Sequence, residues 1–486
     1  MMKKTFGIIL LSAVITPVWA QRVLSLESCR QMALKNNKQL GISKLKQDVA
    51  ENIRKSARTK YLPHVSAIGT YEFTSEEISI LNDGQKAALG GLGTTIGGTL
   101  QSSLGSLIST LPPAAQMQMA QDMANVTAGL NQKGQNIVDA FRTDTRNIFA
   151  GSIVVTQPVF MGGAIVALNK MADINTEMSK NTMEARRHAT LYQIDQAYWQ
   201  VVSLHHKKAL AESYLELVKK FDSDVHKMID EGVATRSDGL SVDVKVNEAE
   251  MTLTKVNDGL VLSRMLLNQL CGLPLNESVV LQDEQADNIA VVELTPQLDV
   301  ESAVAHRPEL KLLQNTVALS KQATNVLKAG NLPQVALMGG YAVSNPNVLN
   351  GFEKKFAGYW HVGVIVRVPI WNWGDVMYKV RASKGATAIA NLELDEAREK
   401  IELQVNQTTF KVDEANKKLT MAQKNIQRAD ENLRTANLGF QEGVISPTVV
   451  MEAQTAWLQA QSQKIDAEID VKLSQVDLQK ALGTLE

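Results

Sequence analysis

The chain has 486 residues, of which 50 are lysine or arginine and 51 are acidic, so its formal net charge is −1. This balance excludes a protein that holds nucleic acid on an electrostatic surface, because such a surface needs a clear excess of basic residues. Aromatic residues make up only 5% of the chain and there are 12 prolines, which favours a chain rich in helices over a globular enzyme.

The first twenty residues have the pattern of a secretory signal peptide. Lys3 and Lys4 precede a short apolar run from Phe6 to Ile15, and small residues then offer a cleavage site after Ala20. No later stretch has about 20 consecutive apolar residues, so no transmembrane helix is predicted. We therefore expect an exported chain that is periplasmic, secreted or a barrel in the outer membrane.

The remainder of the chain consists of two similar repeats. Equivalent residues lie one distance apart in the first half of each repeat and another distance apart in the second half. A shift of 270 residues takes Pro63 to Pro333 and needs no gap over about forty residues. A shift of 211 residues takes Pro158 to Pro369, again without a gap, over more than about a hundred residues. We predict a first structural repeat at 21–273, an equatorial linker at 274–296 and a second repeat at 297–486.

Each repeat reads helix, strand, strand, long helix, short helix. The first helices are predicted at Ser25–Lys60 and Leu298–Ala329. Alternation of apolar and polar residues, with aromatic residues near the ends, is typical of barrel strands. The predicted strands are about 64–73, 148–160, 334–343 and 359–370.

The long helices carry a coiled-coil pattern. From Ile401 to Phe440, apolar or small residues recur at alternating spacings of four and three, which predicts a left-handed coiled coil. The first repeat keeps this seam from Ile194 to Ile229, where Lys208 and Asp222 interrupt it. Such a stripe is longer than the core of a globular protein requires.

The first repeat contains 59 extra residues between Phe73 and Arg146, as the difference between the two shifts requires. We assign them to an extracellular loop at about 74–147, in which amphipathic patches such as Ala114–Asp122 and Ile137–Phe141 allow short helices. Two interpretations remain open, namely a mobile surface loop and a lid over the mouth of a barrel.

Several motifs occur in order and in duplicate. They are Leu-Pro at 62–63 and 332–333, Pro-Val-Phe-Met-Gly-Gly at 158–163, Pro-Ile-Trp-Asn-Trp-Gly at 369–374, and Gly-Val at 232–233 and 443–444. With these motifs the chain resembles the TolC-type outer-membrane efflux proteins. The resemblance implies a mainly α fold with a membrane β-barrel part. Three identical chains would share a twelve-stranded barrel, with four strands each, that continues as a long periplasmic coiled-coil tunnel.

The resemblance also implies the function and the partners. The homotrimer would sit in outer-membrane lipid as the exit duct of an efflux or secretion system. An inner-membrane pump would deliver substrates to it through a periplasmic adaptor, a membrane fusion protein.

In the family, the turns between long and short helices contact the adaptor. The matching residues here are Gly232, Val233, Ala234, Thr235, Gly443, Val444, Ile445 and Ser446. Glycine at these turns is also expected simply because it ends a helix well.

Acidic residues just beyond these turns constrict the tunnel in the family, and they match Asp238 and Glu452 here. Ile445 and Val449 stand where the family has charged residues that hold the tip closed, so closure must differ in this chain. The alternative is that Asp238 and Glu452 are solvated charges on a helix face.

The two cysteines of the chain, Cys29 and Cys271, could form a disulfide in an oxidising compartment or remain buried thiols. We find no phosphate loop, nucleophile elbow or metal-binding Cys/His cluster, so no enzyme activity, cofactor or metal site is predicted.

Two other functions stay open. A soluble periplasmic coiled-coil adaptor or scaffold would explain the heptads and the signal peptide, but not four barrel-like strands. An exit duct for type I protein secretion has the same sequence features as a drug-efflux duct, because the pump selects the cargo.

Overall fold

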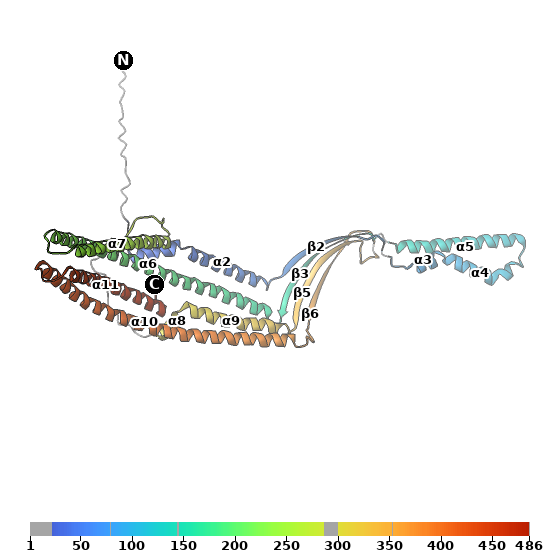
Figure 1. Cartoon of the computed structure of the whole chain (residues 1–486). Helices are drawn as coiled ribbons and strands as arrows, with labels where there is room; N and C mark the ends of the chain where they lie inside the picture. The colour runs from blue at the N-terminus through green and yellow to red at the C-terminus, as the bar shows by residue number, and fades with distance from the viewer. Residues whose placement is uncertain (1–21, 78, 143–144, 286–299, 352, 486) are drawn as a thin grey trace, which may run out of the picture. The chain divides into compact units, whose positions relative to one another are not determined.

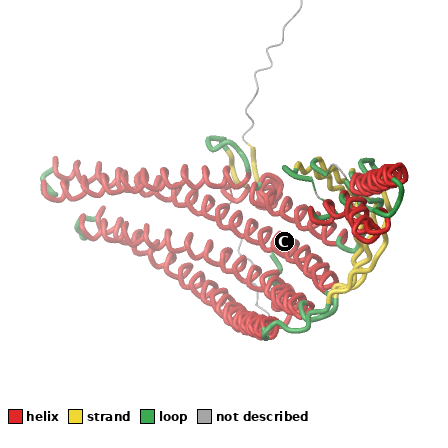
Figure 2. Tube along the Cα trace, turned by 90° about the vertical axis from the view of Figure 1, so that its right-hand side faces the viewer, coloured by secondary structure: helices red, strands yellow, loops and turns green. Residues whose placement is uncertain are grey.

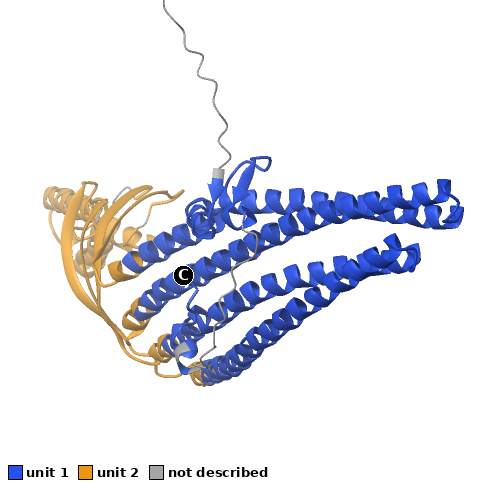
Figure 3. Ribbon diagram, turned by 90° about the vertical axis from the view of Figure 1, so that its left-hand side faces the viewer, with its two compact units in different colours: residues 1–55, 170–323, 381–486 blue, residues 56–169, 324–380 orange. Residues whose placement is uncertain are grey.

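The computed structural model describes residues 22–77, 79–142, 145–285, 300–351 and 353–485. The predicted signal peptide at 1–20 and the linker residues 286–296 lie outside the described residues. The chain forms two compact units, one of residues 1–55, 170–323 and 381–486, the other of residues 56–169 and 324–380 (Figure 3). Within the described residues, no helix is long and apolar enough to span a membrane.

The first unit consists mainly of helices, and helices are drawn in red in Figure 2. The helices that lie wholly or mainly in it are α1 (Leu26–Asn36), α2 (Lys38–Thr59), α6 (Ala164–Asp230), α7 (Arg236–Cys271), α8 (Val300–His306), α9 (Pro308–Ala329), α10 (Asp375–Gln441) and α11 (Pro447–Leu482) (Figure 1). The long helices α6 and α10 have 67 residues each, and the short helices α7 and α11 have 36 each. Both pairs are related by the 211-residue shift. At about 1.5 Å per residue, each long helix measures about 100 Å.

The first helix of each repeat is divided, so the predictions of single helices at Ser25–Lys60 and Leu298–Ala329 were wrong. Asn37 adopts an extended conformation between α1 and α2, and its side-chain oxygen accepts hydrogen bonds from the backbone N–H groups that open α2. At the equivalent place in the second repeat, Arg307 lies between α8 and α9. Pro308 follows it and disfavours a helical conformation at the preceding residue.

The coiled-coil seam of α10 is buried as its spacing predicted. The buried seam residues are Ile401, Val405, Thr408, Val412, Ala415, Leu419, Ala422, Ala429, Leu433, Ala436 and Phe440. Only Ile426, among the predicted seam positions, is partly exposed. Ala415, Leu419 and Ala422 form a cluster with Ala467 and Val471 of α11, because alanine lets the two helices approach closely.

The second unit contains a four-stranded antiparallel sheet with the order β2-β3-β5-β6. Its strands are β2 (His64–Phe73), β3 (Asn147–Met161), β5 (Gln334–Asn345) and β6 (Ala357–Arg367). The first three agree with the prediction to within two residues at each end. The predicted fourth strand ran to residue 370, whereas β6 ends at Arg367, two residues before the Pro369 that has no N–H for a ladder.

The two faces of this sheet differ in polarity. One row of directly opposed residues consists of Ala67, Ile153, Tyr341 and Trp360. The adjacent row, on the other face, consists of Ser66, Val154, Gly340 and His361. On the first face Trp360 is 76% exposed and Val362 is 77% exposed. An exposed apolar face opposite a more polar one is the pattern of a membrane barrel wall.

The inserted segment is helical rather than a loop with two short helices. It forms α3 (Asp83–Gly90), α4 (Leu92–Ile108) and α5 (Pro113–Ala140), which pack against one another. Helix α5 runs through Ala114–Asp122 without a break and ends at Ala140, one residue short of the end of the second patch. A Cβ on Gly93 would lie 2.1 Å from the backbone oxygen of Thr127, so this glycine lets α4 and α5 approach closely.

A small parallel sheet joins the N-terminal segment to the start of the predicted linker. Strand β1 (Arg22–Leu24) pairs with β4 (Val279–Leu281), which is followed by the short 3₁₀ helix η1 (Gln282–Gln285). Leu24 and Leu281 are buried in one core cluster with Tyr198 of α6. The part of the linker that the structure describes is therefore anchored on the long helix.

Candidate functional site

The turns that join α6 to α7 and α10 to α11 have the same backbone geometry. Gly232 has φ +79° and Gly443 has φ +71°, the left-handed conformation that favours glycine. Val233 N–H donates to the Met228 carbonyl at 2.9 Å, and Val444 N–H donates to the Gly439 carbonyl at 2.9 Å. These bonds complete a Schellman motif at the end of each long helix.

The turns expose apolar side chains. Val233 is 67% exposed and Val444 is 81% exposed. Ile445, by contrast, packs back on α10, where a Cβ on Gly439 would lie 2.6 Å from its Cδ1 atom. Exposed valines at rigid turns are suited to contact with another protein, since their burial on binding is favourable and the turn loses little conformational entropy.

A hydrophobic cluster holds the two hairpins together behind these turns. The rings of Phe221 of α6 and Phe440 of α10 lie 4.9 Å apart, and Val242 and Val450 are fully buried with them. A cavity of ≈ 580 Å³ adjoins the cluster and is lined in part by Phe440, Met228 and Val233. The ends of the helices that bear the turns are thus packed against one another.

Asp238 is a helix-capping residue in the structure. Thr235 caps α7 in a reciprocal capping box: its Oγ1 accepts from Asp238 N–H at 3.2 Å, and Asp238 Oδ2 accepts from Thr235 N–H at 3.0 Å. Bonds from the Thr235 hydroxyl and backbone lower the pKa of Asp238, so it is ionised at neutral pH. Its predicted place in a constriction stays a prediction.

The equivalent cap of α11 is different. Ser446 occupies the N-cap position without a side-chain cap bond, and Pro447 opens the helix. Glu452 is exposed on the second turn of α11, and no hydrogen bond or ion pair joins it to Asp238 in the described part of the chain. The predicted place of Glu452 in a constriction stays a prediction.

Cys29 and Cys271 lie close together, on α1 and α7. Both cysteines are fully buried, and Cys271 Sγ lies 3.9 Å from the backbone oxygen of Cys29. The structure thus brings the two predicted partners side by side. A bond between them stays a prediction.

Comparison with known proteins shows what the chain is similar to. Residues 300–484, nearly the whole second repeat, match the family model described as outer membrane efflux protein. This part of the chain therefore carries the domain of the outer membrane efflux proteins. The chain is 21% identical over 373 residues to the outer membrane protein TolC of Vibrio cholerae serotype O1, a match that covers 74% of this chain and 82% of that protein.

The fold agrees with that of solved channels over nearly the whole chain. The outer-membrane channel OprN is matched with a TM-score of 0.73 at 16% identity, covering 94% of this chain and 89% of that one. The outer membrane protein VceC of Vibrio cholerae is matched with a TM-score of 0.71 at 14% identity, covering 94% and 96%. The relative and the solved structures that the chain matches are outer-membrane proteins and channels.

Sequence reasoning missed two features of this efflux protein. The first is the parallel pairing of β1 with β4, since strands of three residues carry too little periodicity to be recognised. The second is the Thr235–Asp238 capping box, which the spacing of a threonine and an acid three residues later could have indicated.

Proposed function

We propose that this protein is the exit duct of a tripartite export system, in which three copies close one barrel and the turns at 232–235 and 443–446 dock a periplasmic adaptor. The duct conducts passively, and an inner-membrane pump supplies the energy and selects the cargo. The observation that carries this proposal is the sheet of four strands with one apolar, exposed face and two open edges.

The open edges require partner strands. Strands β2 and β6 each have one unpaired side in the single chain. Unpaired backbone groups are not tolerated in lipid, and the smallest membrane barrels have about eight strands. Because β2 and β6 run in opposite directions, β6 of one copy can pair with β2 of the next in the same antiparallel sense. Three copies supply twelve strands, the number that the family resemblance implies.

The turns supply the docking surface. Exposed Val233 and Val444 stand on rigid caps, next to the cavity between the hairpins. The adaptor of such a system approaches from the periplasm, and these turns are the ends of the long helices. Adaptor docking at Gly232, Val233, Gly443 and Val444 is therefore favoured over a purely structural role for the caps.

The assembly is tested by mass and by a matched pair of substitutions. Native mass spectrometry of the detergent-extracted protein should give three chains per particle. Val362→Lys, on the apolar face, should reduce assembly, since a lysine facing lipid costs about 2–4 kcal/mol at the midplane of the bilayer. His361→Lys, on the opposite face, should assemble normally. A soluble periplasmic monomer, or equal effects of both substitutions, would overturn the barrel.

Docking is tested at the turns. Val444→Asp and Val233→Asp should abolish export and adaptor cross-linking while leaving the trimer intact. Gln441→Asp is the matched control, because it adds the same charge near the turn without removing an exposed valine. Full export by both valine variants would contradict docking at these turns and leave the barrel assignment standing.

A further inference from the structure

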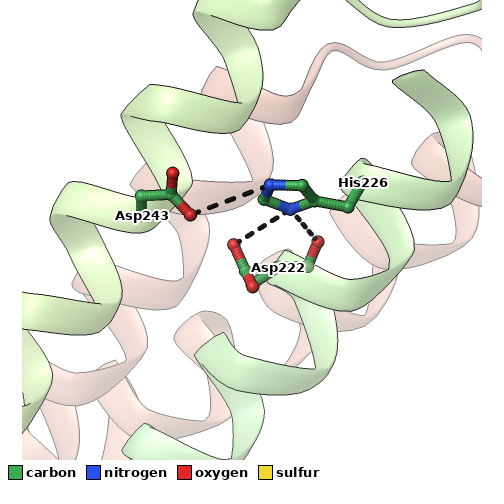
Figure 4. A group of neighbouring side chains, drawn as sticks. All are labelled: Asp222, His226 and Asp243. Atoms are coloured by element: carbon green, nitrogen blue, oxygen red, sulfur yellow. Dashed lines mark hydrogen bonds and ion pairs between the residues drawn. The ribbon is translucent and has the colours of Figure 1, made fainter. Parts of the chain in front are cut away.

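A polar cluster interrupts the apolar seam of the first long helix near its end. Asp222 and His226 lie four residues apart on α6, so they share one face, and Asp243 faces them from α7 (Figure 4). The second repeat has Leu433, Asn437 and Gln454 at the three matching positions, as the 211-residue shift shows. The hydrophobic seam continues there, so the fold itself does not need the charges of the first repeat.

The histidine ring is oriented by its own helix. His226 Nδ1 lies 3.0 Å from the backbone oxygen of Asp222, four residues earlier, and donates its hydrogen to it. In the neutral ring the lone pair is then on Nε2, which faces Asp243 Oδ1 at 3.9 Å (Figure 4). That distance is too long for a hydrogen bond. A histidine held by one nitrogen on a backbone carbonyl, with the other directed at a carboxylate, is arranged like a metal ligand.

The Asp222 side chain contributes a carboxylate oxygen to this cluster that has no hydrogen-bond donor. Its Oδ1 atom is buried and makes no hydrogen bond to any described residue, and His226 Nδ1 lies 3.3 Å from it. Burial raises the pKa of Asp222, and the Asp243 carboxyl raises it further, against the lowering effect of His226. Two carboxyl groups held this close repel each other unless a proton or a cation lies between them.

We propose that Asp222, His226 and Asp243 bind one divalent transition-metal ion of the Zn²⁺ class. The three residues each offer one ligand atom, and these atoms lie within 4.8 Å of one another. Ligands of a tetrahedral zinc ion, at about 2.0–2.2 Å from it, lie about 3.4 Å apart, so rotations that bring the side chains closer together by about 1 Å complete the site. A mixed nitrogen and carboxylate set suits Zn²⁺ better than Mg²⁺ or Ca²⁺, which prefer oxygen alone.

The site leaves room for water. His226 and Asp243 have side chains that are 49% and 47% exposed, so solvent can supply a fourth ligand and the ion can enter from the periplasm. The bound ion would link α6 to α7. Its ligand Asp222 lies about ten residues, or roughly 15 Å along the helix, before the Gly232 turn. Only the first of the two hairpins has the residues for this metal site.

Metal binding is measured on the full trimeric protein, without a polyhistidine tag and stripped with a chelator, by calorimetric titration with Zn²⁺ at pH 8. The alkaline pH keeps the ring neutral, because the bond to the Asp222 carbonyl and the nearby acidic charges raise the pKa of His226. The expected result is one Zn²⁺ per chain. His226→Asn and Asp243→Gln, which install amide side chains like those of the second repeat, should weaken binding at least tenfold.

Two controls make the result decisive. Asp224→Asn removes an exposed acid on the same helix, paired with Lys227, and should bind Zn²⁺ as the wild type does. Circular dichroism in chelator should be the same for all variants, which excludes misfolding as the cause of lost binding. Zn²⁺ should raise the melting temperature of the wild type and of Asp224→Asn only. Absence of saturable binding, or unchanged binding by His226→Asn, would overturn the site.

Discussion

Arg30 of α1 and Asp195 of α6 form a two-pronged ion pair, with Nη2 2.6 Å from Oδ2 and Nε 2.8 Å from Oδ1. The Asp195 side chain is fully buried, while that of Arg30 is 17% exposed. The pair joins the first short helix to the long helix beside the core cluster that contains Ile194 and Tyr198. Such paired, planar contacts fix geometry as well as adding energy.

Removing one partner of this pair should be more damaging than removing both. Arg30→Met leaves the Asp195 carboxylate buried without its cation, which costs about 3–5 kcal/mol. Adding Asp195→Asn to the same chain removes the uncompensated charge, so the double variant should recover part of the loss. The measurement is the temperature at which helical circular dichroism is lost. A double variant less stable than Arg30→Met would show that the charge is not the cause.

Arg307 should act as a clamp on the end of α11. It is 8% exposed, and its Nη1 donates to the carbonyl oxygens of Lys480 at 2.9 Å and Ala481 at 3.1 Å. Carbonyls in the last turn of a helix have no partner within the helix. Arg307→Met should therefore cost about 1–3 kcal/mol, because the Ala481 carbonyl loses its donor, whereas the Lys480 carbonyl keeps the Gly483 N–H at 3.1 Å. Arg307→Lys should lie in between, because an ammonium group cannot form the planar fork.

Thermal unfolding of the extracted protein measures this series. Lys311→Met, an exposed position on the neighbouring helix α9, is the control for loss of a positive charge. If Arg307→Met and Lys311→Met melt at the same temperature, the carbonyl bonds do not stabilise the helical unit.

The order of the helices and strands, and the lengths of the longest helices, could be predicted from the sequence for physical reasons. The two repeats keep their spacing without gaps, so the lengths of α6, α7, α10 and α11 follow from one another. The apolar seam from Ile401 to Phe440 alternates spacings of four and three. Among regular conformations, only a coiled coil of helices buries residues at these spacings. Strand positions followed from alternation, since one face of each strand is apolar.

Details that depend on single side chains could not be predicted in this way. Asn37 and Arg307 occupy the same place in the two repeats and both mark a helix break, but they act through different atoms. Asn37 caps α2 with its side-chain oxygen, whereas Arg307 reaches across to α11. A pattern of hydrophobicity contains no information about such contacts. Likewise, Asp222 was recognised as an interruption of the seam, but only the structure shows Asp243 beside it.

The cap of α7 gives a prediction that separates capping from constriction. Thr235→Ala and Asp238→Ala each remove half of the capping box, so each should cost about 1 kcal/mol locally, or about a fivefold faster hydrogen exchange in the first turns of α7. Only Asp238→Ala also removes the charge. If Asp238 constricts the tunnel, this variant should raise single-channel conductance while Thr235→Ala does not.

Acid should weaken the same cap. The pKa of Asp238 is lowered in the folded protein by its bonds to Thr235. A carboxyl with a lowered pKa stabilises the fold above the pKa of the unfolded chain, near ~3.9, and this contribution is lost as the pH falls through the lower folded value. Exchange in α7, corrected for the intrinsic rate, should therefore be constant from pH 7 to pH 5 and rise only below that window. A rise between pH 7 and pH 5 would point to a different group.

The inserted helices should be removable without loss of assembly. Helices α3, α4 and α5 pack on one another, and the stem below them is closed by Thr74 N–H donating to the Arg146 carbonyl at 2.9 Å and by an ion pair of Arg142 with Glu77 at 3.2 Å. Replacing residues 83–140 with a short Gly-Ser turn keeps this stem. The second repeat connects its equivalent strands, β5 and β6, with only a short segment.

Native mass spectrometry should then show the same number of chains, each lighter by the deleted segment. Dissociation of the particle would mean that the insertion holds the copies together. Conductance in planar bilayers and the antibiotic sensitivity of cells distinguish the two interpretations of its function. A lid obstructs the mouth of the barrel, so its removal raises both; a surface segment that leaves the mouth open changes neither. A further variant keeps α3–α5 and carries Gly93→Leu, which prevents the close approach of α4 to α5. It should have the same phenotype as the deletion only if the packed arrangement of these helices forms the obstruction.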